Sequence, residues 1–478
     1  MSRSVLLAAI VLVVAAGCTD ERIVFRDRDL LADLPANAQG FLGYSNADAK
    51  LTVCGNCHVG PQTQWVGTAH ADAWATLANN PGRQAFCEAC HTVSEAGNQT
   101  EGGNAGWPAT QDTRYHDVQC ESCHGPGLDH VRNPGATQPL ASLGVTIGAE
   151  TGCGECHSGI HHPFVEEWAE SGHGQVLAVP AGRPECQGCH TGQGALVAFG
   201  AHDAEYVEKG STTPLPIACG VCHDPHSATF EGQLRYPITV PDEEQNLCMR
   251  CHHKRGLPET GSPSRGPHSP EGPLLLGDAG WFPPNMPLEP GTEIIGTHGS
   301  QANPRLCAGC HVYRFDVTDQ ATGDFLISSV GHRFDAIPCV DANGAPTGEA
   351  ECERSQRSFA SCTGSGCHVD QARARQALES AETSINFFAA LLKSALDKVP
   401  ASEFSATDNR YSTAEGARFN WQLALVNGSE VHNPFLIEAL LIASIQQLKI
   451  EYDVDPNQPA ALESRLTPPP AMRVRSSD

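Results

Sequence analysis

Eight short segments of this chain place two cysteines and a histidine in one fixed arrangement, Cys-x-x-Cys-His. The cysteine and histidine contents of the chain would give about 0.04 such motifs by chance, so eight of them indicate a shared chemistry. The motifs are Cys54/Cys57/His58, Cys87/Cys90/His91, Cys120/Cys123/His124, Cys153/Cys156/His157, Cys186/Cys189/His190, Cys219/Cys222/His223, Cys248/Cys251/His252 and Cys307/Cys310/His311.

This spacing is that of the attachment site of c-type haem. Two thiols one short turn apart can reach the two vinyl groups of one porphyrin, and the histidine that follows then lies under the iron as its proximal ligand. Paired Cys-x-x-Cys zinc ribbons are the alternative, but they would need motifs in pairs and would not require the histidine. The eight motifs therefore predict eight covalently bound haems, each with its motif histidine on the iron.

A ninth segment, residues 362–368, keeps the two cysteines and the histidine but has four residues between the cysteines. Gly364 and Gly366 would allow this wider loop to bulge while both thiols reach a porphyrin. The alternative is a Cys362–Cys367 disulfide, which would leave the adjacent His368 unexplained. We therefore predict nine haems c, with His368 as the ninth proximal ligand, and eight haems if this site is empty.

Each iron needs a sixth ligand unless it is catalytic, and histidine is the residue type available in excess. Only four methionines exist, and most of them lie in the leader, inside a haem motif or in the tail. Bis-histidine ligation, which gives lower potentials than Met/His ligation, is the natural inference. The candidate distal ligands are His70, His116, His130, His161, His162, His173, His202, His226, His268, His298, His332 and His432.

The first six motifs begin every 33 residues, and the pattern repeats more closely every 99 residues. Trp65 precedes His70 by five positions after the first motif, and Trp168 precedes His173 in the same way after the fourth. We interpret this as a duplicated trihaem unit, residues 54–152 and 153–247. The matched positions favour His70, His130, His173 and His226 as ligands, while His161 and His162 compete without a counterpart in the first copy.

Residues 248–368 form a third haem region that is rich in Pro and Gly up to about residue 304. So long an irregular stretch is unusual in a compact domain unless it is functional, and it contains His268 and His298. We expect it to wrap the seventh and eighth haems. Cys339 and Cys352 belong to no haem motif, and a disulfide between them would stabilise the fold by roughly 3 kcal/mol.

The C-terminal part, residues 369–453, has a helical pattern. Apolar residues recur at alternating spacings of three and four from 370 to 399, a second helical pattern covers about 414–427, and a third begins at the cap Asn433 with Pro434 in its first turn. We expect a helical hairpin over the last haem. Residues 454–478 have the composition of a disordered tail.

The N-terminus has the layout of an export signal, with Arg3, an apolar run and small residues before Cys18. It resembles a bacterial lipoprotein processing site, which predicts a signal peptide at 1–17, lipidated Cys18 and a tether at 18–53. Thr19, by analogy with such lipoproteins, favours the outer membrane, on its periplasmic or cell-surface face. The net charge of −25 argues against nucleic-acid binding.

Several of these segments resemble a known family. "CGECHSGIHHPFVEEWAESGH" and "CESCHGPGLDHV" are similar to the multihaem cytochromes c of the cytochrome c554 and hydroxylamine oxidoreductase superfamily. "VNGSEVHNPFLIEALL" resembles a segment of the related pentahaem nitrite reductases. The resemblance implies closely packed haem pairs with little regular structure around them, His432 as a distal ligand, and Cys-x4-Cys-His as a known variant of the attachment motif.

The sequence departs from the enzymes of that superfamily. The nitrite reductases attach their catalytic haem through a motif that ends in Lys, and no Cys-x-x-Cys-Lys is present here. We therefore expect a mainly α protein with extensive loops that transfers electrons at the cell envelope, between redox proteins or periplasmic and extracellular carriers, and that has no catalytic residues. A nitrite, hydroxylamine or tetrathionate oxidoreductase with one open haem, and a cytochrome filament subunit, remain as alternatives.

Overall fold

A computed structural model of the chain describes residues 34–98, 105–143, 152–259, 265–284, 286, 297–364, 367–405, 408 and 410–457. The expected signal peptide, Cys18 and most of the expected tail lie outside the described residues. Within the described ranges, no helix combines the length and the apolar composition needed to cross a bilayer.

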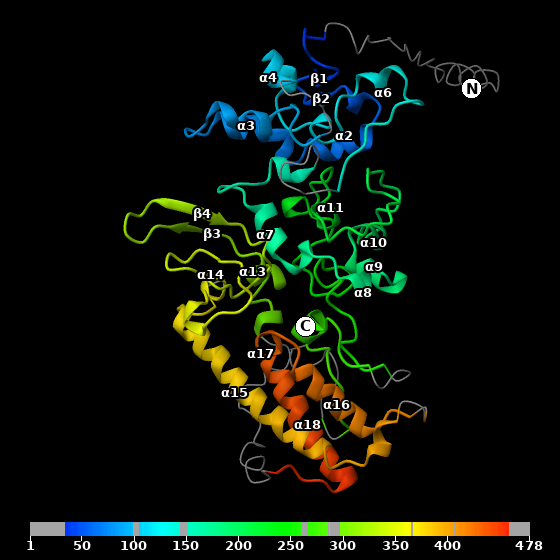
Figure 1. Cartoon of the computed structure of the whole chain (residues 1–478), viewed down its shortest axis with the longest axis vertical. Helices are drawn as coiled ribbons and strands as arrows, with labels where there is room; N and C mark the ends of the chain where they lie inside the picture. The colour runs from blue at the N-terminus through cyan, green and yellow to red at the C-terminus, as the bar shows by residue number, and fades with distance from the viewer. Residues whose placement is uncertain are drawn as a thin grey trace, which may run out of the picture.

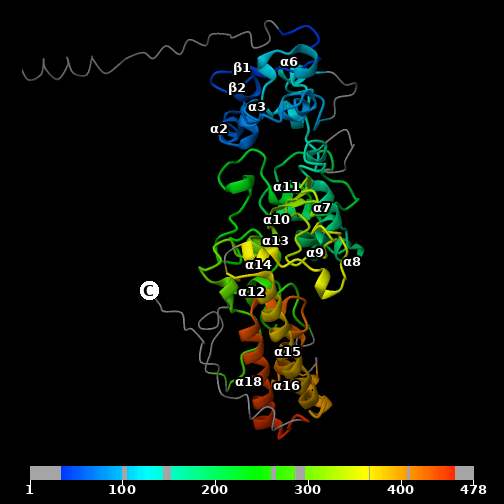
Figure 2. The ribbon, with the colours of Figure 1, turned by 90° about the vertical axis from the view of Figure 1, so that its left-hand side faces the viewer.

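The molecule is elongated, and its parts follow one another in chain order along the long axis (Figure 1). The first motifs lie at one end and three long helices at the other, with the remaining motifs between them. The view turned by 90° shows the same order from end to end (Figure 2). A long, thin array of cofactor sites is therefore compatible with this shape.

Short helices and turns make up the part that contains the motifs, because each motif supplies only one helical turn. The α-helices and strands before residue 260 are β1 (Tyr44–Asn46), β2 (Leu51–Thr52), α2 (Val59–Trp65), α3 (Ala73–Ala78), α4 (Trp107–Thr110), α5 (Glu121–His124), α6 (Leu128–Arg132), α7 (Phe164–Glu170), α8 (Ala178–Ala181), α9 (Pro184–His190), α10 (Gly192–Ala198) and α11 (Cys219–Cys222). After them come α12 (Glu271–Leu276), α13 (Cys307–His311), β3 (Phe315–Thr318), β4 (Phe325–Ser329) and α14 (Ala360–Gly364).

Several connections form 3-10 turns, which are typical of short pieces between other elements. They are η1 (Cys54–Asn56), η2 (Ala69–Asp72), η3 (Ala85–Cys87), η4 (Ala89–His91), η5 (Thr113–Tyr115), η6 (Cys153–Glu155), η7 (Gly172–Gly174), η8 (Glu231–Gln233), η9 (Thr297–Gly299), η10 (Arg354–Gln356) and η11 (Ala401–Phe404).

The long helices are α15 (Gln371–Leu396), α16 (Thr413–Ala424) and α18 (Pro434–Tyr452), with the short α17 (Ser429–His432) before the last. The predicted cap of α18 is confirmed, since the Asn433 side chain accepts the backbone N–H of Leu436. At the start of α16, Ser412 and Glu415 form a capping box that the sequence analysis did not identify. The three long helices all contact one another, so the expected hairpin is a three-helix bundle. The second helix packs against both others because it also has a buried apolar face.

The largest apolar cluster of the described residues lies inside this bundle. Phe388 and Leu392 of α15 and Leu440 of α18 are almost completely buried in it. The described residues of the part that contains the motifs form only small clusters, such as the one around Ala195 and Leu196 of α10. A core of aliphatic side chains therefore stabilises one end of the molecule, and the rest depends on other interactions.

Buried carboxylates hold the loops of the haem-binding part in place. Glu121, in the third motif, accepts the backbone N–H groups of Leu42, Gly43 and Gly127 at 2.7–3.0 Å. Burial raises the pKa of Glu121 to about 7, against the lowering effect of these hydrogen bonds. One side chain thus fastens the N-terminal segment and the chain before α6 to the third motif.

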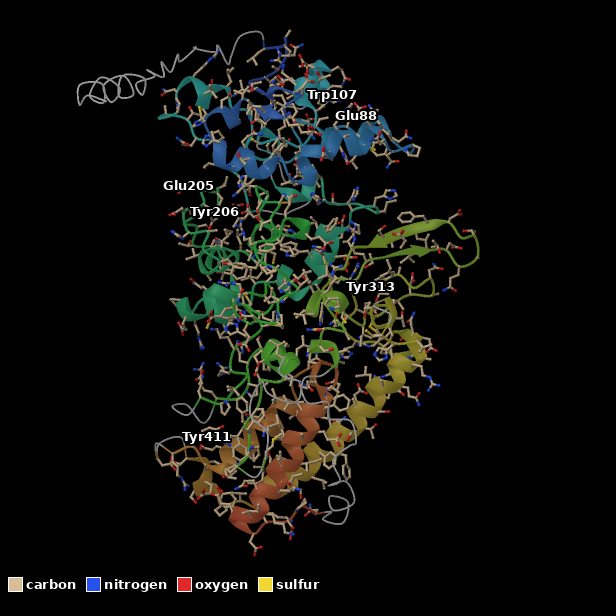
Figure 3. All side chains as sticks on the ribbon, turned by 180° about the vertical axis from the view of Figure 1, so that it is seen from behind. Glu88, Trp107, Glu205, Tyr206, Tyr313 and Tyr411 are labelled. Atoms are coloured by element: carbon tan, nitrogen blue, oxygen red, sulfur yellow. A yellow bond between two sulfur atoms is a disulfide. The ribbon has the colours of Figure 1, made fainter. Side chains whose placement is uncertain are left out.

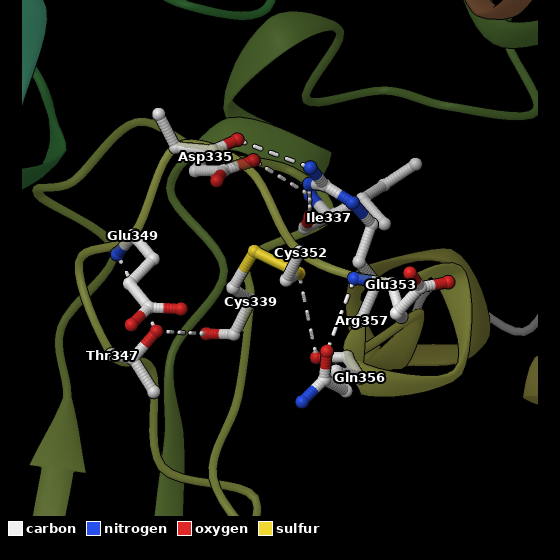
Figure 4. The surroundings of a disulfide bond; sticks show 10 residues. Asp335, Ile337, Cys339, Thr347, Glu349, Cys352, Glu353, Gln356 and Arg357 are labelled. Carbon is white, nitrogen blue, oxygen red and sulfur yellow. Dashed lines mark hydrogen bonds between the residues drawn. A yellow bond between two sulfur atoms is a disulfide. The ribbon is translucent and has the colours of Figure 1, made fainter.

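A strand hairpin adds to the predicted architecture, and the predicted disulfide between Cys339 and Cys352 is present. The strands β3 and β4 form an antiparallel hairpin that the sequence analysis did not anticipate. Cys339 and Cys352 are joined by a disulfide, flanked by the backbone bridge between Cys339 and Arg357. Figure 4 shows the loop that this bond closes, with Thr347 donating to the carbonyl of Cys339. The mainly helical, loop-rich fold class is confirmed.

The bundle gives a direct test of where the aliphatic core lies. Leu392→Ala should lower the free energy of unfolding of the bundle by about 2–5 kcal/mol, because it leaves a cavity in close-packed surroundings. Leu425→Ala, at a side chain that is 57% exposed, is the matched control and should change it by less than about 0.5 kcal/mol. Thermal unfolding followed by far-ultraviolet circular dichroism measures both, and equal effects would contradict the assignment of the core.

Candidate haem-binding sites

Eight motif histidines each face one other histidine at a nearly constant distance. The ring centroids of the two partners are 6.0–6.3 Å apart in every case. The pairs, with the motif histidine first, are His58–His130, His157–His70, His124–His226, His252–His173, His190–His268, His223–His332, His368–His298 and His311–His432.

The angle between the paired rings varies widely while their distance does not. The rings of His124 and His226 are almost parallel, at 10°, whereas those of His173 and His252 are nearly perpendicular, at 78°. Direct ring packing would prefer particular combinations of distance and angle. A constant distance with a free angle is what two rings show when both point at one atom between them.

The separation fits an axially ligated metal. Two imidazole nitrogens that bind opposite sides of one metal lie about 4 Å apart, and each ring centre lies about 1 Å further out, which gives about 6 Å between centroids. The residues therefore fit a haem iron with two axial histidines. His368 of the wide motif has the same ring separation from its partner, His298.

The local backbone places both cysteines and the histidine of a motif on one turn. The backbone N–H of the motif histidine donates to the carbonyl of the first cysteine at 2.9 Å in the motifs of His58, His124, His157 and His223. The hydrogen bond closes a single helical turn, so that the two sulfurs and the imidazole converge on one side. This arrangement explains why the motifs form short α-helices or 3-10 turns.

The two predicted attachment cysteines of the first motif differ in their surroundings. Cys57 is exposed, whereas Cys54 is partly buried and interacts with Cys120 of the third motif. Cys57 follows the η1 turn at its C-terminal end, and the first motif lies near one end of the molecule, so less of the chain surrounds it (Figure 1). The attachment of haem through Cys57 remains a prediction from the motif spacing.

Backbone carbonyls orient many of the rings. Nδ1 of His91 pairs with the carbonyl of Ala73 at 2.9 Å, and Nδ1 of His311 with that of Phe334 at 2.7 Å. His298 has the same kind of contact with Val431 at 2.7 Å. An acceptor at Nδ1 fixes the tautomer and leaves Nε2 free to bind a metal.

Burial keeps several of these rings neutral. It lowers the pKa of His124, His157, His173 and His432 to about 4. A neutral imidazole has a nitrogen lone pair available for a metal, whereas a protonated one has none. These rings are therefore competent ligands at neutral pH.

The two copies of the predicted trihaem unit hold His70 and His173, both predicted distal ligands, in the same way. The indole N–H of Trp65 donates to the carbonyl of Val118, whose own N–H donates to the carbonyl of His70. In the second copy, Trp168 donates to Ile217, whose N–H donates to the carbonyl of His173. The repeat seen in the sequence thus coincides with a repeated set of hydrogen bonds.

Glu167 has a role that the sequence analysis did not identify. Its fully buried carboxylate accepts the N–H groups of Val330 and His332 at 2.9 and 2.6 Å and pairs with Arg333 at 2.9 Å. These contacts fasten the segment of His332 to α7, so that His332 faces His223. An acidic residue in a helix gives no sequence signal for such a contact.

The remaining motif histidine, His91 of the second motif, lies near His162. The electrostatic effect of His91 contributes to lowering the pKa of His162, as does that of the neighbouring His161, although burial has the largest effect. His161 itself stacks on Phe325 of β4, with centroids 4.9 Å apart at 6°. Of the two adjacent histidines that the sequence left as competitors, His162 is therefore the one that interacts electrostatically with a motif histidine.

The other histidines have different surroundings. His116 stacks on Trp74 at 3.9 Å and lies 4.6 Å from Trp107, whose position Figure 3 shows. His202 is 64% exposed and pairs with Asp203 at 3.0 Å. His116, His161 and His202, all candidate ligands from the sequence, therefore have other partners in the structure.

The wide motif lies against the eighth one. Thiols Cys362 and Cys367 are close enough to Cys310 to raise its pKa, together with the larger effect of burial. Gly364 approaches the Tyr313 ring so closely that a Cβ atom there would lie 2.2 Å from it. Figure 3 shows Tyr313 beside the β3–β4 hairpin. A glycine at 364 thus permits contact between the two motif segments as well as the wider loop.

Comparison with known proteins places these motifs in a family context. Residues 53–125 match the family described as cytochrome c554 and c-prime, and residues 214–256 match the doubled CXXCH motif. The chain is 29% identical over 193 residues to the multiheme cytochrome MtrA of Shewanella baltica, which covers 36% of this chain. The matched part spans 53% of that relative, about half its length.

The fold also has a counterpart among solved structures. An undecaheme cytochrome from the S-layer of Carboxydothermus ferrireducens superimposes with a TM-score of 0.51 at 19% identity. The superposition covers 95% of this chain and 74% of that one. At this identity the likeness concerns the fold, and it extends over nearly the whole molecule.

The paired histidines can be tested individually. His173→Ala should convert one iron per chain from six-coordinate low spin to five-coordinate high spin, because one axial ligand is lost. His202→Ala is the matched control and should leave the spectrum unchanged, since His202 is exposed and paired with Asp203. Electron paramagnetic resonance of both oxidised variants measures this. A fully low-spin His173 variant would contradict the assignment.

Proposed function

Because this chain is a multihaem cytochrome c, we propose that it is a nonahaem electron conduit in which every iron has two axial histidines. The main support for this proposal is the set of eight histidine pairs, each of which includes one motif histidine. The proposed distal ligands are His70, His130, His162, His173, His226, His268, His298, His332 and His432.

Bound haem supplies one-electron exchange between ferric and ferrous iron, with no transfer of atoms. The chain's residues attach the porphyrins through cysteine pairs, close both faces of each iron with imidazoles, and keep the sites at fixed spacing. Two imidazoles favour low potentials relative to Met/His ligation. Such a chain takes electrons from a reduced redox protein or carrier and passes them to an oxidised one.

The same proposal places the protein outside the cytoplasm. Covalent haem sites, a disulfide and the predicted signal all suit an oxidising compartment. A lipid on Cys18, followed by the tether to residue 53, would hold the conduit at the outer membrane. The redox partners would then be periplasmic or extracellular electron carriers and other cytochromes.

The domain organisation that we propose has two trihaem units, residues 54–152 and 153–247, and a third region at 248–368. The units are not self-contained, because histidine pairs cross their boundaries. His70 of the first unit faces His157 of the second, and His226 of the second faces His124 of the first. Residues 369–453 add the helical bundle, whose α17 carries His432 to the eighth motif.

One specific observation favours a second candidate function. His91 is the motif histidine that lies outside the eight close ring pairs, and an iron open on one side there could bind a small nitrogen or sulfur species. The nearby His162 instead favours an iron with a second histidine ligand at this site. Turnover of nitrite, hydroxylamine or tetrathionate, together with a high-spin signal in the unmodified protein, would support the enzyme over the conduit.

The haem count tests the wide motif. The double variant Cys362→Ala/Cys367→Ala should lower the haem-to-protein ratio from nine to eight, because it removes both attachment thiols. The matched control, Cys339→Ala/Cys352→Ala, removes the same number of sulfurs at the disulfide and should leave nine haems. Pyridine haemochrome absorbance with protein quantification gives the ratio, and eight haems in the unmodified protein would contradict the nonahaem proposal.

A further inference from the structure

The motifs contact one another through particular cysteines. The first contact type joins the first cysteines of two motifs: Cys54 with Cys120, Cys153 with Cys219, and Cys248 with Cys307. The packing beside these cysteines makes the same links. Thr52, two residues before Cys54, has its Oγ1 3.7 Å from Sγ of Cys120, and the indole N–H of Trp168, after motif 4, donates at 2.8 Å to the carbonyl of Ile217, just before motif 6. Cys307 packs against the apolar cluster that contains Met249 of motif 7. In motif numbers counted along the chain, these contacts link motif 1 to 3, motif 4 to 6 and motif 7 to 8.

The second contact type joins the second cysteines of two motifs. Cys90 interacts with Cys156 and also approaches the carbonyl of Glu155 at 4.0 Å. Cys189 interacts with Cys251, which packs against the apolar cluster of α10. These contacts link motif 2 to 4 and motif 5 to 7.

A third set of contacts joins successive groups. Cys123 lies close enough to interact electrostatically with Cys153 and Cys156, and Cys222 with Cys251. The backbone supports the first of these links, since the N–H of Gly152 donates to the carbonyl of Gly97 beside the third motif. With Cys310 beside the wide motif, motif 3 is linked to 4, motif 6 to 7 and motif 8 to 9.

Motifs 4 and 7 differ from the others because each of them contacts three other motifs, motif 4 also touching motif 3 and motif 7 also touching motif 6. The first cysteine of motif 4 faces motif 6 and its second faces motif 2. Motif 7 uses its first cysteine toward motif 8 and its second toward motif 5. Two motifs are thus positioned to have three neighbours each.

We propose that the nine sites form one branched array, with a main line through motifs 1, 3, 4, 6, 7, 8 and 9 and with motifs 2 and 5 as side branches on motifs 4 and 7. The inference rests on the proposed function, since it orders the haem sites that function requires. Sequence order and electron-transfer order therefore differ.

The 99-residue repeat accounts for the branches. Each complete unit supplies two motifs to the main line and one side branch, and the links of the first unit recur in the second. The third region has motifs 7 and 8 in the positions of the first and third motifs of a unit. It has no counterpart of the middle motif, so the main line continues there without a branch.

Each side site lies close to a histidine from the region of the chain that follows its own unit. Motif 5 faces His268, which comes after motif 7 in the chain. Motif 2 lies near His162, which comes after motif 4. Each side site therefore takes its second imidazole from the region that follows its own unit, and the repeat assigns His162 to His91. The side sites are additional positions for electron entry or exit away from the two ends of the main line.

Paired variants of the holoprotein test the branches. Cys120→Ala/Cys123→Ala, which interrupts the main line, should lower single-molecule conductance along the long axis at least about fivefold more than Cys87→Ala/Cys90→Ala, which removes a side site. Each variant should contain eight haems by haemochrome assay, which separates loss of one site from failure to fold. Equal loss of conductance in both would overturn the branched order.

A structure of the holoprotein phased at the iron edge is the second measurement. The iron of motif 4 should have those of motifs 2, 3 and 6 as neighbours, and the iron of motif 2 should have one neighbour. Nine irons with motif 2 or motif 5 inside the main line would overturn this inference and leave the proposed function intact. Fewer than nine irons, or irons far from the histidine pairs, would contradict the proposed function itself.

Discussion

Two imidazole rings that bind one iron from opposite sides must keep their centres about 6 Å apart, and the chain meets this requirement eight times with segments that are often distant in sequence. This constraint accounts for the irregular backbone of the first two thirds of the molecule. A regular helix or sheet could not present a motif histidine on one side and a second histidine from another segment at the required distance on the other. Short turns that end at each motif can do so.

The same constraint determines how the rest of the chain is stabilised. Within the described residues, the segments that carry the paired histidines lack a large apolar core, and buried polar side chains fasten them instead. Glu121 holds three backbone N–H groups around the third motif, and Glu167 holds the segment of His332. The aliphatic core is concentrated in the α15–α16–α18 bundle, whose α17 extends to the eighth motif. The bundle therefore stabilises the end of the molecule that lies next to the eighth motif.

The sequence was sufficient for the features with a local signal. The attachment motifs, the bundle helices with the cap at Asn433, and the repeat of Trp65 and Trp168 are all determined by neighbouring residues. The pairing of distal histidines is not, because it depends on how separate segments pack. The sequence could not distinguish His162 from His161 as a distal ligand, and it left both His116 and His202 as candidates for that role. The structure separates them through the ring of Phe325, the stack on Trp74 and the ion pair with Asp203.

Burial of the attachment cysteines is a second property that spacing does not determine. Cys54 and Cys57 have the same relation to their histidine as the cysteines of the other motifs, yet Cys57 is exposed and Cys54 is partly buried. The difference arises from the contact between Cys54 and Cys120, which belongs to a motif 66 residues further along the chain. Contacts of this kind between distant motifs become apparent only when the segments are folded together.

The central claim is that every iron is held between two histidines of this chain. Near-infrared magnetic circular dichroism of the fully oxidised protein reads the pair of axial ligands at each ferric iron. The account predicts that bis-histidine charge-transfer bands account for all of the haem, including the site on the Cys362–Cys367 motif. A band from histidine–methionine ligation or a substantial high-spin fraction in the unmodified protein would contradict it.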